Sequence, residues 1–466
     1  MLFPTLDYFL FLPLVAAGYQ LLAARGARAG LLLIASLAFY VAWNPADTLI
    51  LLAVSALAYS AGLLMEGREE RRRAVVAWGF GLLMVVPLCF YKYTGFVLDN
   101  LRAVWPGAPA PPPRHLPIGI SFYTFQALAY VIDVRRGESN ERNPGRFLAF
   151  LLFFPHLVAG PILRASTLLA QLREARTPTR DDVGHGMARL CAGLVKKVLV
   201  ADVLRIGMVD SVFTDPTRFT ALEVLFALYA YSLQIYCDFS GYTDFAIGSA
   251  RLFGFHIPEN FDRPYQALSV ANYWRRWHIT LSDWVRDYVY LPMGGSRGEG
   301  LVPYRNTFVT LLILAIWHGA RWTFVLYGII HGAAVSLNRW WRKSGPGVHR
   351  APPTASGTLW RFLLTLHFVV LARILFRADD MDGAIAVVNA LTGNLSGALP
   401  RYSVHAWAVF VLGWVWHFTP RAWVPTLRNR FAALPPWTWG VLLVAVAWAC
   451  AAWGPGDTLS FIYHDF

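Results

Sequence analysis

A succession of apolar stretches, most of them close to the length that crosses a lipid bilayer, dominates the chain. A membrane-spanning helix needs about 20 largely apolar residues, and hydropathy places candidate spans at 8–23, 29–43, 48–65, 74–91, 117–133, 147–163, 218–236, 306–317, 321–338, 358–376, 404–418 and 436–453. Several of them are short or interrupted by Gly, Pro or His, which indicates re-entrant or interfacial segments. We therefore predict an all-α polytopic membrane protein with roughly 10–12 transmembrane helices.

Composition and charge distribution agree with a membrane protein. Of the 466 residues, 56% are apolar and only 15% are charged, and the mean hydropathy is +0.43. This composition is more apolar and less charged than that of an ordinary soluble domain. The formal charge of +13 lies in short loops between apolar stretches and forms no single basic face, so it indicates membrane topology and not nucleic-acid binding. No repeat or soluble segment interrupts the sequence, which favours one domain over residues 1–466.

Basic residues alternate between successive loops and predict an orientation. The first loop holds Arg25 and Arg28, the next (NPAD) has no basic residue, and the third is EGREERRR at 66–73. By the positive-inside rule, residues 66–73 are expected in the cytoplasm and the N-terminus outside. The first apolar run carries Asp7 and no preceding Lys or Arg, which argues against a cleaved signal peptide.

Several classes of site lack support in the sequence. Cys89, Cys191, Cys237 and Cys450 are widely scattered and show no metal-ligand spacing, so neither a disulfide framework nor a zinc site is indicated. No GxSxG, Walker or HExxH motif occurs, which leaves hydrolase, ATPase and metalloprotease functions without a motif. No metal is predicted.

His318, in AIWHGARW, is a titratable ring inside a strongly apolar region. If helical, 306–316 rises only about 16 Å, so His318 is expected near mid-bilayer at a helix break, with Gly319 allowing a turn or close packing. An intramembrane ionisable residue is first explained by function, and a neutral imidazole suits a general base for O-acyl transfer. A packing histidine is an equal alternative, because His331, His367 and His417 also fall in apolar segments.

Residues 270–290 have Trp and other apolar side chains at helical spacing, with arginines on other faces. This pattern predicts a helix at the lipid headgroup level, where His278 is more readily an interfacial anchor than a catalytic group. The basic loop that follows and RWWRK at 339–343 favour the cytoplasmic surface.

Two further polar clusters have structural and functional interpretations. Asp238, Ser240, Tyr242 and Asp244 in CDFSGYTDF either orient a His or Arg, or hold a helix break, which we prefer. The loop 294–297 (GGSR) offers backbone amides and a guanidinium to phosphate, although two adjacent glycines more often make an ordinary turn.

Motifs spread in order over most of the chain share one resemblance. They are SLAFYVAWNP, FYKYTGF, LPIGISFYTFQALAYVIDVRRG, FFPHLVAGPI, YCDFSGYTDFAIG, ENFDRPY, YWRRWHITLSDWVRDYVYLPMGG, WHGARWTFVLYGIIHG and ILFRADD. Together they resemble the membrane-bound O-acyltransferase family, of the type of the bacterial alginate O-acetyltransferase membrane subunit. The pairing of RRWH with WHG is the most specific part of the match.

The resemblance implies a catalytic fold and site. The family's active-site histidine falls on His318 and its second characteristic histidine on His278, within a core segment of about 236–342. The implied fold is a helical bundle around a funnel that reaches the histidine from the cytoplasm. Such a protein would lie in the bacterial inner membrane.

The resemblance also implies a reaction. Acetyl groups from a cytoplasmic donor, expected to be acetyl-CoA, would pass across the membrane to a periplasmic partner protein and then to an exopolysaccharide such as alginate. Arg275, Arg276, Arg286 and Arg297 suit capture of the anionic donor. Within the family, D-alanyl transfer to teichoic acid is the alternative; outside it, a transporter or flippase would show inverted repeats, which the sequence lacks.

Overall fold

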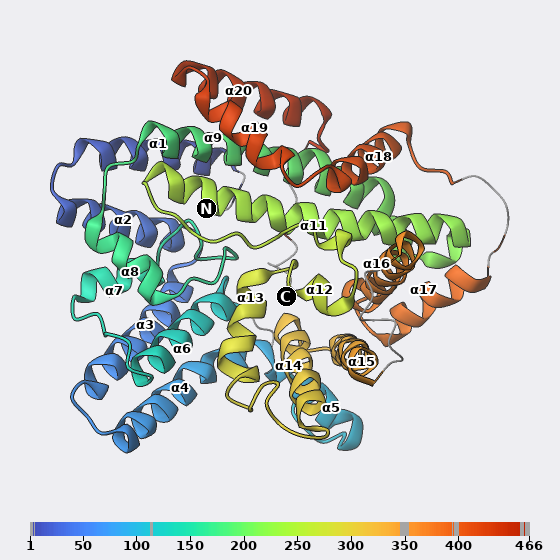
Figure 1. The fold of residues 1–466 in the computed structure, drawn as a ribbon, viewed down its shortest axis with the longest axis horizontal. Helices are drawn as coiled ribbons and strands as arrows, with labels where there is room; N and C mark the ends of the chain where they lie inside the picture. Colours follow the sequence, from blue (N-terminus) through green and yellow to red (C-terminus); the bar gives the residue numbers. More distant parts are fainter. Residues whose placement is uncertain are drawn as a thin grey trace. The chain divides into compact units, whose positions relative to one another are not determined.

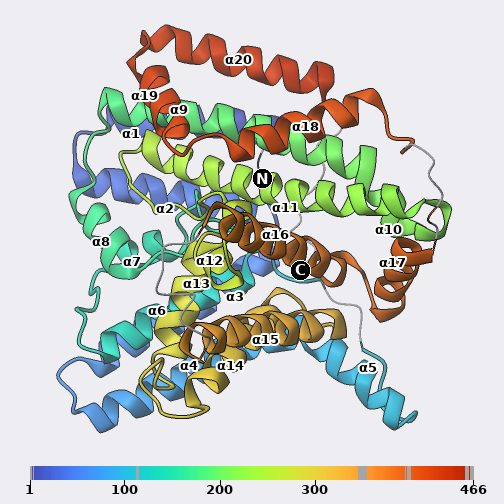
Figure 2. The ribbon, with the colours of Figure 1, turned by 45° about the vertical axis from the view of Figure 1, so that its right-hand side comes forward.

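A computed structural model describes residues 3, 5–111, 115–344, 354–393, 395, 400–456 and 461, and every regular element in these ranges is a helix (Figure 1 and Figure 2). These residues form two compact units: 1–193, 242–258 and 425–445 make unit 1, and 194–241, 259–424 and 446–466 make unit 2. The all-α prediction is confirmed. That the whole chain acts as one domain stays a prediction.

Unit 1 is built mainly from the N-terminal helices. Its elements are α1 Leu6–Leu21, α2 Arg25–Val41, α3 Pro45–Met65, α4 Glu70–Lys92, α5 Thr94–Val104, α6 Ile120–Arg135, α7 Pro144–Leu151, α8 Ala165–Glu174, α9 Arg180–Leu194, the end of α11 Ala221–Leu252, most of α19 Trp423–Ala433 and the start of α20 Pro436–Trp453. The start of α3 shows why such helices form: the Asn44 side chain accepts from the Ala46 and Asp47 amides, and Pro45 occupies the first turn.

Unit 2 holds the segments that carry the predicted site. Its elements are η1 Val195–Asp202, η2 Arg205–Val209, α10 Asp210–Thr214, η3 Pro216–Arg218, most of α11, η4 Pro264–Gln266, α12 Val270–Trp274, α13 Ile279–Val285, η5 Arg286–Tyr290, α14 Val302–His318, α15 Trp322–Ser344, α16 Ala355–Arg377, α17 Met381–Gly393, α18 Val404–Phe418 and the end of α20.

Nearly every predicted apolar stretch contains a helix close to its expected bounds. In the described part of the chain, α3, α4, α16 and α20 are long and apolar enough to cross a membrane, and α1 and α18 are shorter apolar helices. This is fewer than the 10–12 crossings expected, and the full number stays a prediction. The stretch 147–163 is wrong as a span: α7 ends at Leu151, and turns follow through Pro155, Gly160 and Pro161, residues that interrupt helices.

The predicted continuous helix over 270–290 is also wrong. The segment consists of α12, a turn, α13 and the π-helix η5, and His278 has a left-handed backbone with φ of 44°, which a continuing α-helix does not allow. Its tryptophans are not at a lipid interface either. Trp277 is 1% exposed and packs on Phe261 and Tyr273 in unit 2.

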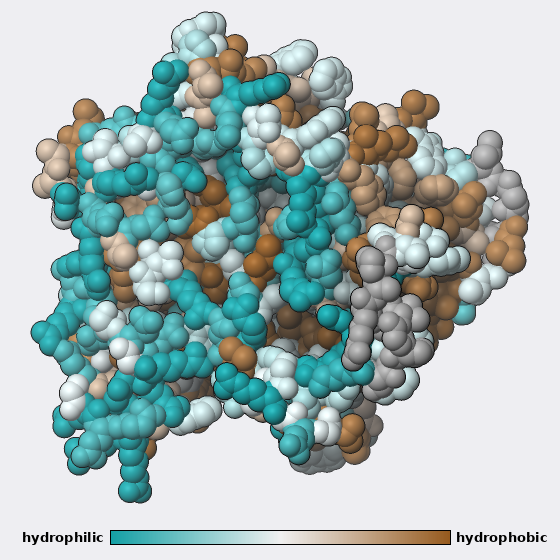
Figure 3. All heavy atoms as spheres, in the orientation of Figure 1, coloured by the Kyte–Doolittle hydropathy of each residue, from teal (hydrophilic) through white to brown (hydrophobic). Residues whose placement is uncertain are grey.

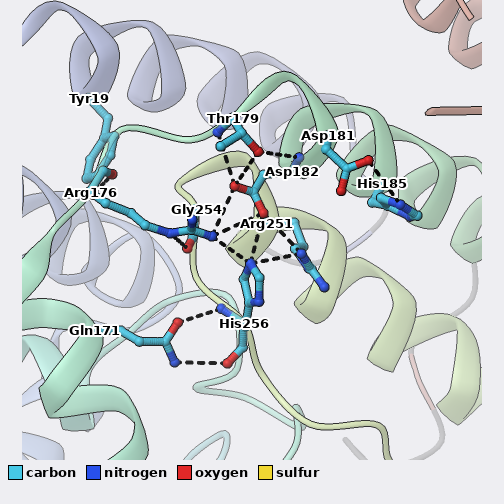
Figure 4. Close-up of polar contacts among 10 residues, drawn as sticks. All are labelled: Tyr19, Gln171, Arg176, Thr179, Asp181, Asp182, His185, Arg251, Gly254 and His256. Carbon is cyan, nitrogen blue, oxygen red and sulfur yellow. Dashed lines mark hydrogen bonds and ion pairs between the residues drawn. The ribbon is translucent and has the colours of Figure 1, made fainter. Parts of the chain in front are cut away.

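Unit 1 contains a charged cluster centred on Asp182, in the first turn of α9 (Figure 4). The Asp182 carboxylate accepts from the Thr179 amide at 3.1 Å, and the Thr179 hydroxyl accepts from the Asp182 amide at 3.1 Å, which is a capping-box arrangement. The same carboxylate contacts Arg176 at 3.1 Å, Arg251 at 3.0 Å and His256 at 2.8 Å. It thereby ties the start of α9 to the end of α11.

The surface shows which groups face outward. Figure 3 shows hydrophilic side chains around the turn between α3 and α4, where EGREERRR lies, and hydrophobic side chains over α18. On α18, Val404, Leu412 and Val415 are at least 60% exposed. An apolar outer surface on an apolar helix is the pattern of a helix that faces lipid.

Candidate functional site

His318 is the last residue of α14, at a break between two packed helices. Gly319 is extended, with φ of −168° and ψ of 150°, and α15 begins at Trp322. The two helices run antiparallel, since Gly328 lies against Ala315 and Gly332 against Phe308. The predicted break is confirmed. Because α14 begins at Val302, the arm leading to His318 is longer than expected, and mid-bilayer depth stays a prediction.

Close packing fixes the position of the His318 ring. The side chain is 1% exposed, and its ring centre lies 5.0 Å from that of Trp317, 5.2 Å from Phe376 and 6.4 Å from Phe324. A Cβ atom at Gly319 would overlap the Phe324 ring. Glycine therefore allows the turn after His318 to approach this aromatic wall.

His278 is fully buried, and Asn260 orients it. Asn260 Oδ1 lies 3.1 Å from His278 Nδ1 and also accepts from the Thr280 amide at 3.2 Å and the Thr280 hydroxyl at 2.9 Å. Because this oxygen only accepts, His278 Nδ1 carries the proton and Nε2 has the lone pair. The Phe239 ring packs at 4.7 Å. Burial at 0% exposure excludes the interfacial anchor that the sequence suggested.

Trp317 connects the two predicted histidines. Its ring centre is 5.9 Å from that of His278 and 5.0 Å from that of His318. The Trp317 ring therefore contacts the histidine of both motifs, His278 of RRWH and His318 of WHG, although these lie 40 positions apart in the sequence. The sequence missed Asn260 as the group that fixes the tautomer of His278, although it lies in the quoted ENFDRPY motif.

Two further buried polar side chains of unit 2 are Arg373 and His331. Arg373 is 0% exposed, and its guanidinium carbon lies 5.2 Å from the centre of the Phe376 ring, the ring that also contacts His318. His331, 1% exposed, accepts a hydrogen bond from the Trp274 indole at 3.2 Å. Sequence reasoning passed over Arg373, although a charge within an apolar span was a usable signal.

Among the described residues, no hydrogen bond or ion pair joins the four arginines proposed for donor capture into one cluster. Arg275 and Arg297 are exposed, and Arg286 pairs with Asp283 and Asp287 at 2.5 and 2.7 Å. Arg276 donates to Asn272 at 3.2 Å and to the Asp262 carbonyl at 3.4 Å. Their role in binding a donor stays a prediction, and it is weakest for Arg286, whose charge already has partners.

The polar cluster of CDFSGYTDF holds no helix break, because α11 runs through it without interruption. Its carboxylates pair with cations instead. Asp238 contacts Lys197 at 2.7 Å in unit 2, and Asp244 contacts Arg189 at 2.6 Å and Arg428 at 3.3 Å in unit 1. The alternative in which these acids face cationic partners is the right one.

The loop 294–297 forms a turn. Gly294 and Gly295 have φ of 96° and 54°, and the Asn306 amide donates to the carbonyls of Met293 at 2.8 Å and Gly295 at 3.2 Å. Arg339 on α15 donates to the Ser296 hydroxyl at 3.3 Å. The basic end of α15 therefore lies at the start of α14, opposite the end that carries His318.

No metal centre is evident in the part of the chain that the structure describes. There, no three His, Cys, Asp or Glu side chains are grouped to hold an ion, and none of the four cysteines forms a disulfide. The site consists of imidazoles, a guanidinium and aromatic rings.

Comparison with known proteins identifies what this chain resembles. Residues 37–377 match the membrane-bound O-acyltransferase family. The chain is 40% identical over 391 residues to the probable alginate O-acetylase AlgI of Pseudomonas aeruginosa, covering 82% of this chain and 73% of that protein.

Two other relatives have different acceptors in their names. The peptidoglycan O-acetyltransferase of Helicobacter pylori is 33% identical over 417 residues, 83% of this chain and 78% of that protein. The teichoic acid D-alanyltransferase of Bacillus subtilis is 26% identical over 325 residues, 66% of this chain and 79% of that protein. The match over residues 37–377 includes His278, His318 and Arg373, and this chain belongs to the membrane-bound O-acyltransferase family.

Proposed function

We propose that this protein takes acetyl groups from a cytoplasmic donor and passes them across the inner membrane for O-acetylation of an exopolysaccharide such as alginate, with His318 as the catalytic base. Membership of the family makes it an O-acyltransferase of the membrane, which requires an acyl donor. The acetyl group and the polymer are inferred from relatives that act on alginate and peptidoglycan. The single observation that carries the role of His318 is its buried ring at the end of α14, held by Trp317 and Phe376.

The reaction needs one proton acceptor and one activated acyl group. His318 takes the proton of the acceptor hydroxyl as its oxygen attacks the thioester carbonyl of acetyl-CoA. The carbon–sulfur bond then breaks, and the thiolate of coenzyme A receives a proton from the imidazolium. The products are an acetyl ester and free coenzyme A. A dry, aromatic environment limits competing hydrolysis of the thioester.

His278 has a supporting position in this proposal. Its Nδ1 proton is directed to Asn260, so Nε2 acts as an acceptor, and Trp317 links its ring to that of His318. We propose that His278 orders the site around Trp317. Arg275, Arg276 and Arg297 would attract coenzyme A at the basic side, and a periplasmic partner protein would carry the acetyl group onward to the polymer.

The test compares His318→Ala with His367→Ala in a deletion strain. His367 also lies on an apolar helix but is exposed, so it is a matched control. Loss of a general base costs on the order of 10²–10⁴ in rate. We expect His318→Ala to abolish acetylation of the exopolysaccharide at normal membrane levels, while His367→Ala retains it.

Full acetylation by the His318→Ala strain would refute the role of His318. Unaltered polymer acetylation in the deletion strain, together with loss of D-alanyl esters, would instead identify a teichoic acid D-alanyltransferase. Transport of a solute without release of coenzyme A would place the protein in a different class.

A further inference from the structure

Arg373 is a buried cation held by aromatic side chains. It is 0% exposed, and its Nη2 donates to the Tyr273 hydroxyl at 2.5 Å. Its guanidinium carbon lies 4.4 Å from the centre of the Trp277 ring and 5.2 Å from that of Phe376, distances typical of cation–π contacts. Burial of an ionised group is costly, and an apolar side chain would fill the same space at lower cost. The guanidinium therefore points to a specific role.

The Trp277 ring belongs to the segment that carries His278. Trp277 directly precedes His278, and its ring packs at 5.1 Å on Phe261, the residue after Asn260. Asn260 orients the His278 ring at 3.1 Å, and its carbonyl accepts from the Ile279 amide at 2.9 Å. The contact of the guanidinium with Trp277 therefore bears on the whole turn around His278.

The turn at His278 needs support from its surroundings. Its backbone is left-handed, with φ of 44° and ψ of 57°, a conformation that is strained in a residue with a side chain and persists only where neighbouring groups impose it. The Tyr273 and Trp277 rings before the turn are stacked, with centres 5.8 Å apart and planes at 16°. Arg373 contacts both rings, one at its hydroxyl and the other at its face, and thereby holds the start of the turn.

Phe376 extends the same contact to His318. It lies three residues after Arg373 on α16, so the two side chains are neighbours on one face of the helix. The Phe376 ring centre is 5.2 Å from that of His318 and 5.2 Å from that of Phe324, the ring that a Cβ atom at Gly319 would overlap. One guanidinium therefore contacts a neighbour of each histidine of the site.

We propose that Arg373 is a positioning residue for the two histidines of the acyl-transfer site. Its guanidinium fixes the ring that precedes His278 and the ring that packs on His318, and so sets where the two imidazoles lie relative to each other. This role rests on the proposed acyl transfer, in which Arg373 itself takes no proton. Displacement of a catalytic group by about 1 Å costs on the order of 100-fold in rate, so loss of this link should slow transfer without weakening donor binding.

Arg373→Met, Arg373→Lys and Tyr273→Phe test the proposal, with Arg361→Met as the matched control. Arg361 is half-buried nearer the start of α16. Methionine removes the charge, lysine keeps the charge without the planar guanidinium, and Tyr273→Phe removes only the hydroxyl that accepts from Arg373. Inverted membrane vesicles of the complemented deletion strain would receive radiolabelled acetyl-CoA, and acetyl transfer would give the KM for the donor and kcat per folded molecule.

We expect Arg373→Met to lower kcat about 100-fold, with the KM for acetyl-CoA and the melting temperature close to those of wild type. Arg373→Lys should recover part of that loss, to about tenfold below wild type. Tyr273→Phe should lower kcat in the wild-type background but cause no further loss in Arg373→Met, because the hydroxyl acts through the guanidinium. Arg361→Met should keep the kcat and KM of wild type.

Three results would overturn the proposal. A merely structural role of Arg373 would lower the melting temperature and leave kcat per folded molecule unchanged. A raised KM at unchanged kcat would assign Arg373 to donor binding, and wild-type kcat in Arg373→Lys would show that charge suffices without the guanidinium geometry. If Arg373→Met does not fold, Tyr273→Phe decides the matter, because an unchanged kcat in that conservative variant refutes the link.

The same assay separates this proposal from the proposed function. If wild-type vesicles transfer no acetyl group, the proposed function fails, and the positioning role in it falls as well. If wild type transfers acetyl groups and Arg373→Met does so equally fast, only the positioning role fails.

Discussion

The Asp182 cluster in unit 1 and the surroundings of Arg373 in unit 2 each contain a buried charged side chain, and they differ in whether an opposite charge pairs with it. Asp182 is 2% exposed, yet two arginines, a histidine and the Thr179 cap satisfy it (Figure 4). Arg373 is equally buried but lacks a carboxylate, and two of its nitrogens lack partners in the described chain. Ion pairs therefore offset the burial of the Asp182 charge, whereas the Trp277 and Phe376 rings and the Tyr273 hydroxyl surround that of Arg373.

The largest expected effect concerns the break beside His318. Gly319→Ala would drive a Cβ atom into Phe324, which also packs on Phe376 at 5.2 Å. Displacement of a catalytic group by about 1 Å costs on the order of 100-fold in rate. We expect that loss in acetyl transfer, with membrane insertion retained.

Gly440→Ala controls for this prediction, because nothing lies within 4 Å of a Cβ atom at that position. Equal activity of the Gly319→Ala and wild-type proteins would show that the turn tolerates the displacement, and would weaken the contrast between the His318 site and the rest of the molecule.

The second effect concerns stability in unit 1. Burial by itself raises the pKa of the Asp182 carboxyl, but the hydrogen bonds that it accepts, led by that from the Thr179 amide, lower it to about 2. A shift of this size corresponds to about 2 kcal/mol. Asp182→Asn should lower the stability of unit 1 by about that amount and leave acetyl transfer per folded molecule unchanged.

Reaction of buried thiols during heating provides the measurement. Cys191 lies on α9 in unit 1 and Cys237 lies in unit 2, and both are buried. Asp182→Asn should expose Cys191 at a lower temperature than in wild type. A large loss of activity in molecules with a protected Cys191 would contradict the purely structural role of this cluster.

The third effect is a dependence on pH. Because the folded pKa of Asp182 lies below its ordinary value of 3.8, its contribution is complete above about pH 4 and is lost as the pH falls toward 2. Melting temperatures of wild type and Asp182→Asn should therefore converge over this range. A constant difference down to pH 2 would show that packing, and not the carboxylate charge, causes the effect.

The smallest effect is expected from His256→Ala. The His256 side chain is 49% exposed and is only one of several partners of Asp182, so the loss should stay below about 1 kcal/mol. Acetyl transfer should match wild type. Taken with the inactivity expected of His318→Ala, this variant separates a histidine that completes a charge cluster from one that performs chemistry.

The succession of long apolar stretches in the sequence determined the all-α membrane class and most helix positions, because burial in lipid demands long apolar helices. It also predicted the break after His318, since an imidazole followed by glycine interrupts the apolar run. The motif order identified the family. Local sequence, however, predicted one helix over 270–290, because periodicity does not report the left-handed turn at His278.

Tertiary structure alone decided which buried polar groups are satisfied. Asp238 and Asp244 look alike in CDFSGYTDF, yet they pair with Lys197 and Arg189 in different units. Trp317 joins His278 and His318, and Phe376 lies between His318 and Arg373. Hydropathy reports the cost of burying each group, but whether a partner from a distant segment offsets that cost depends on the packing of the helices.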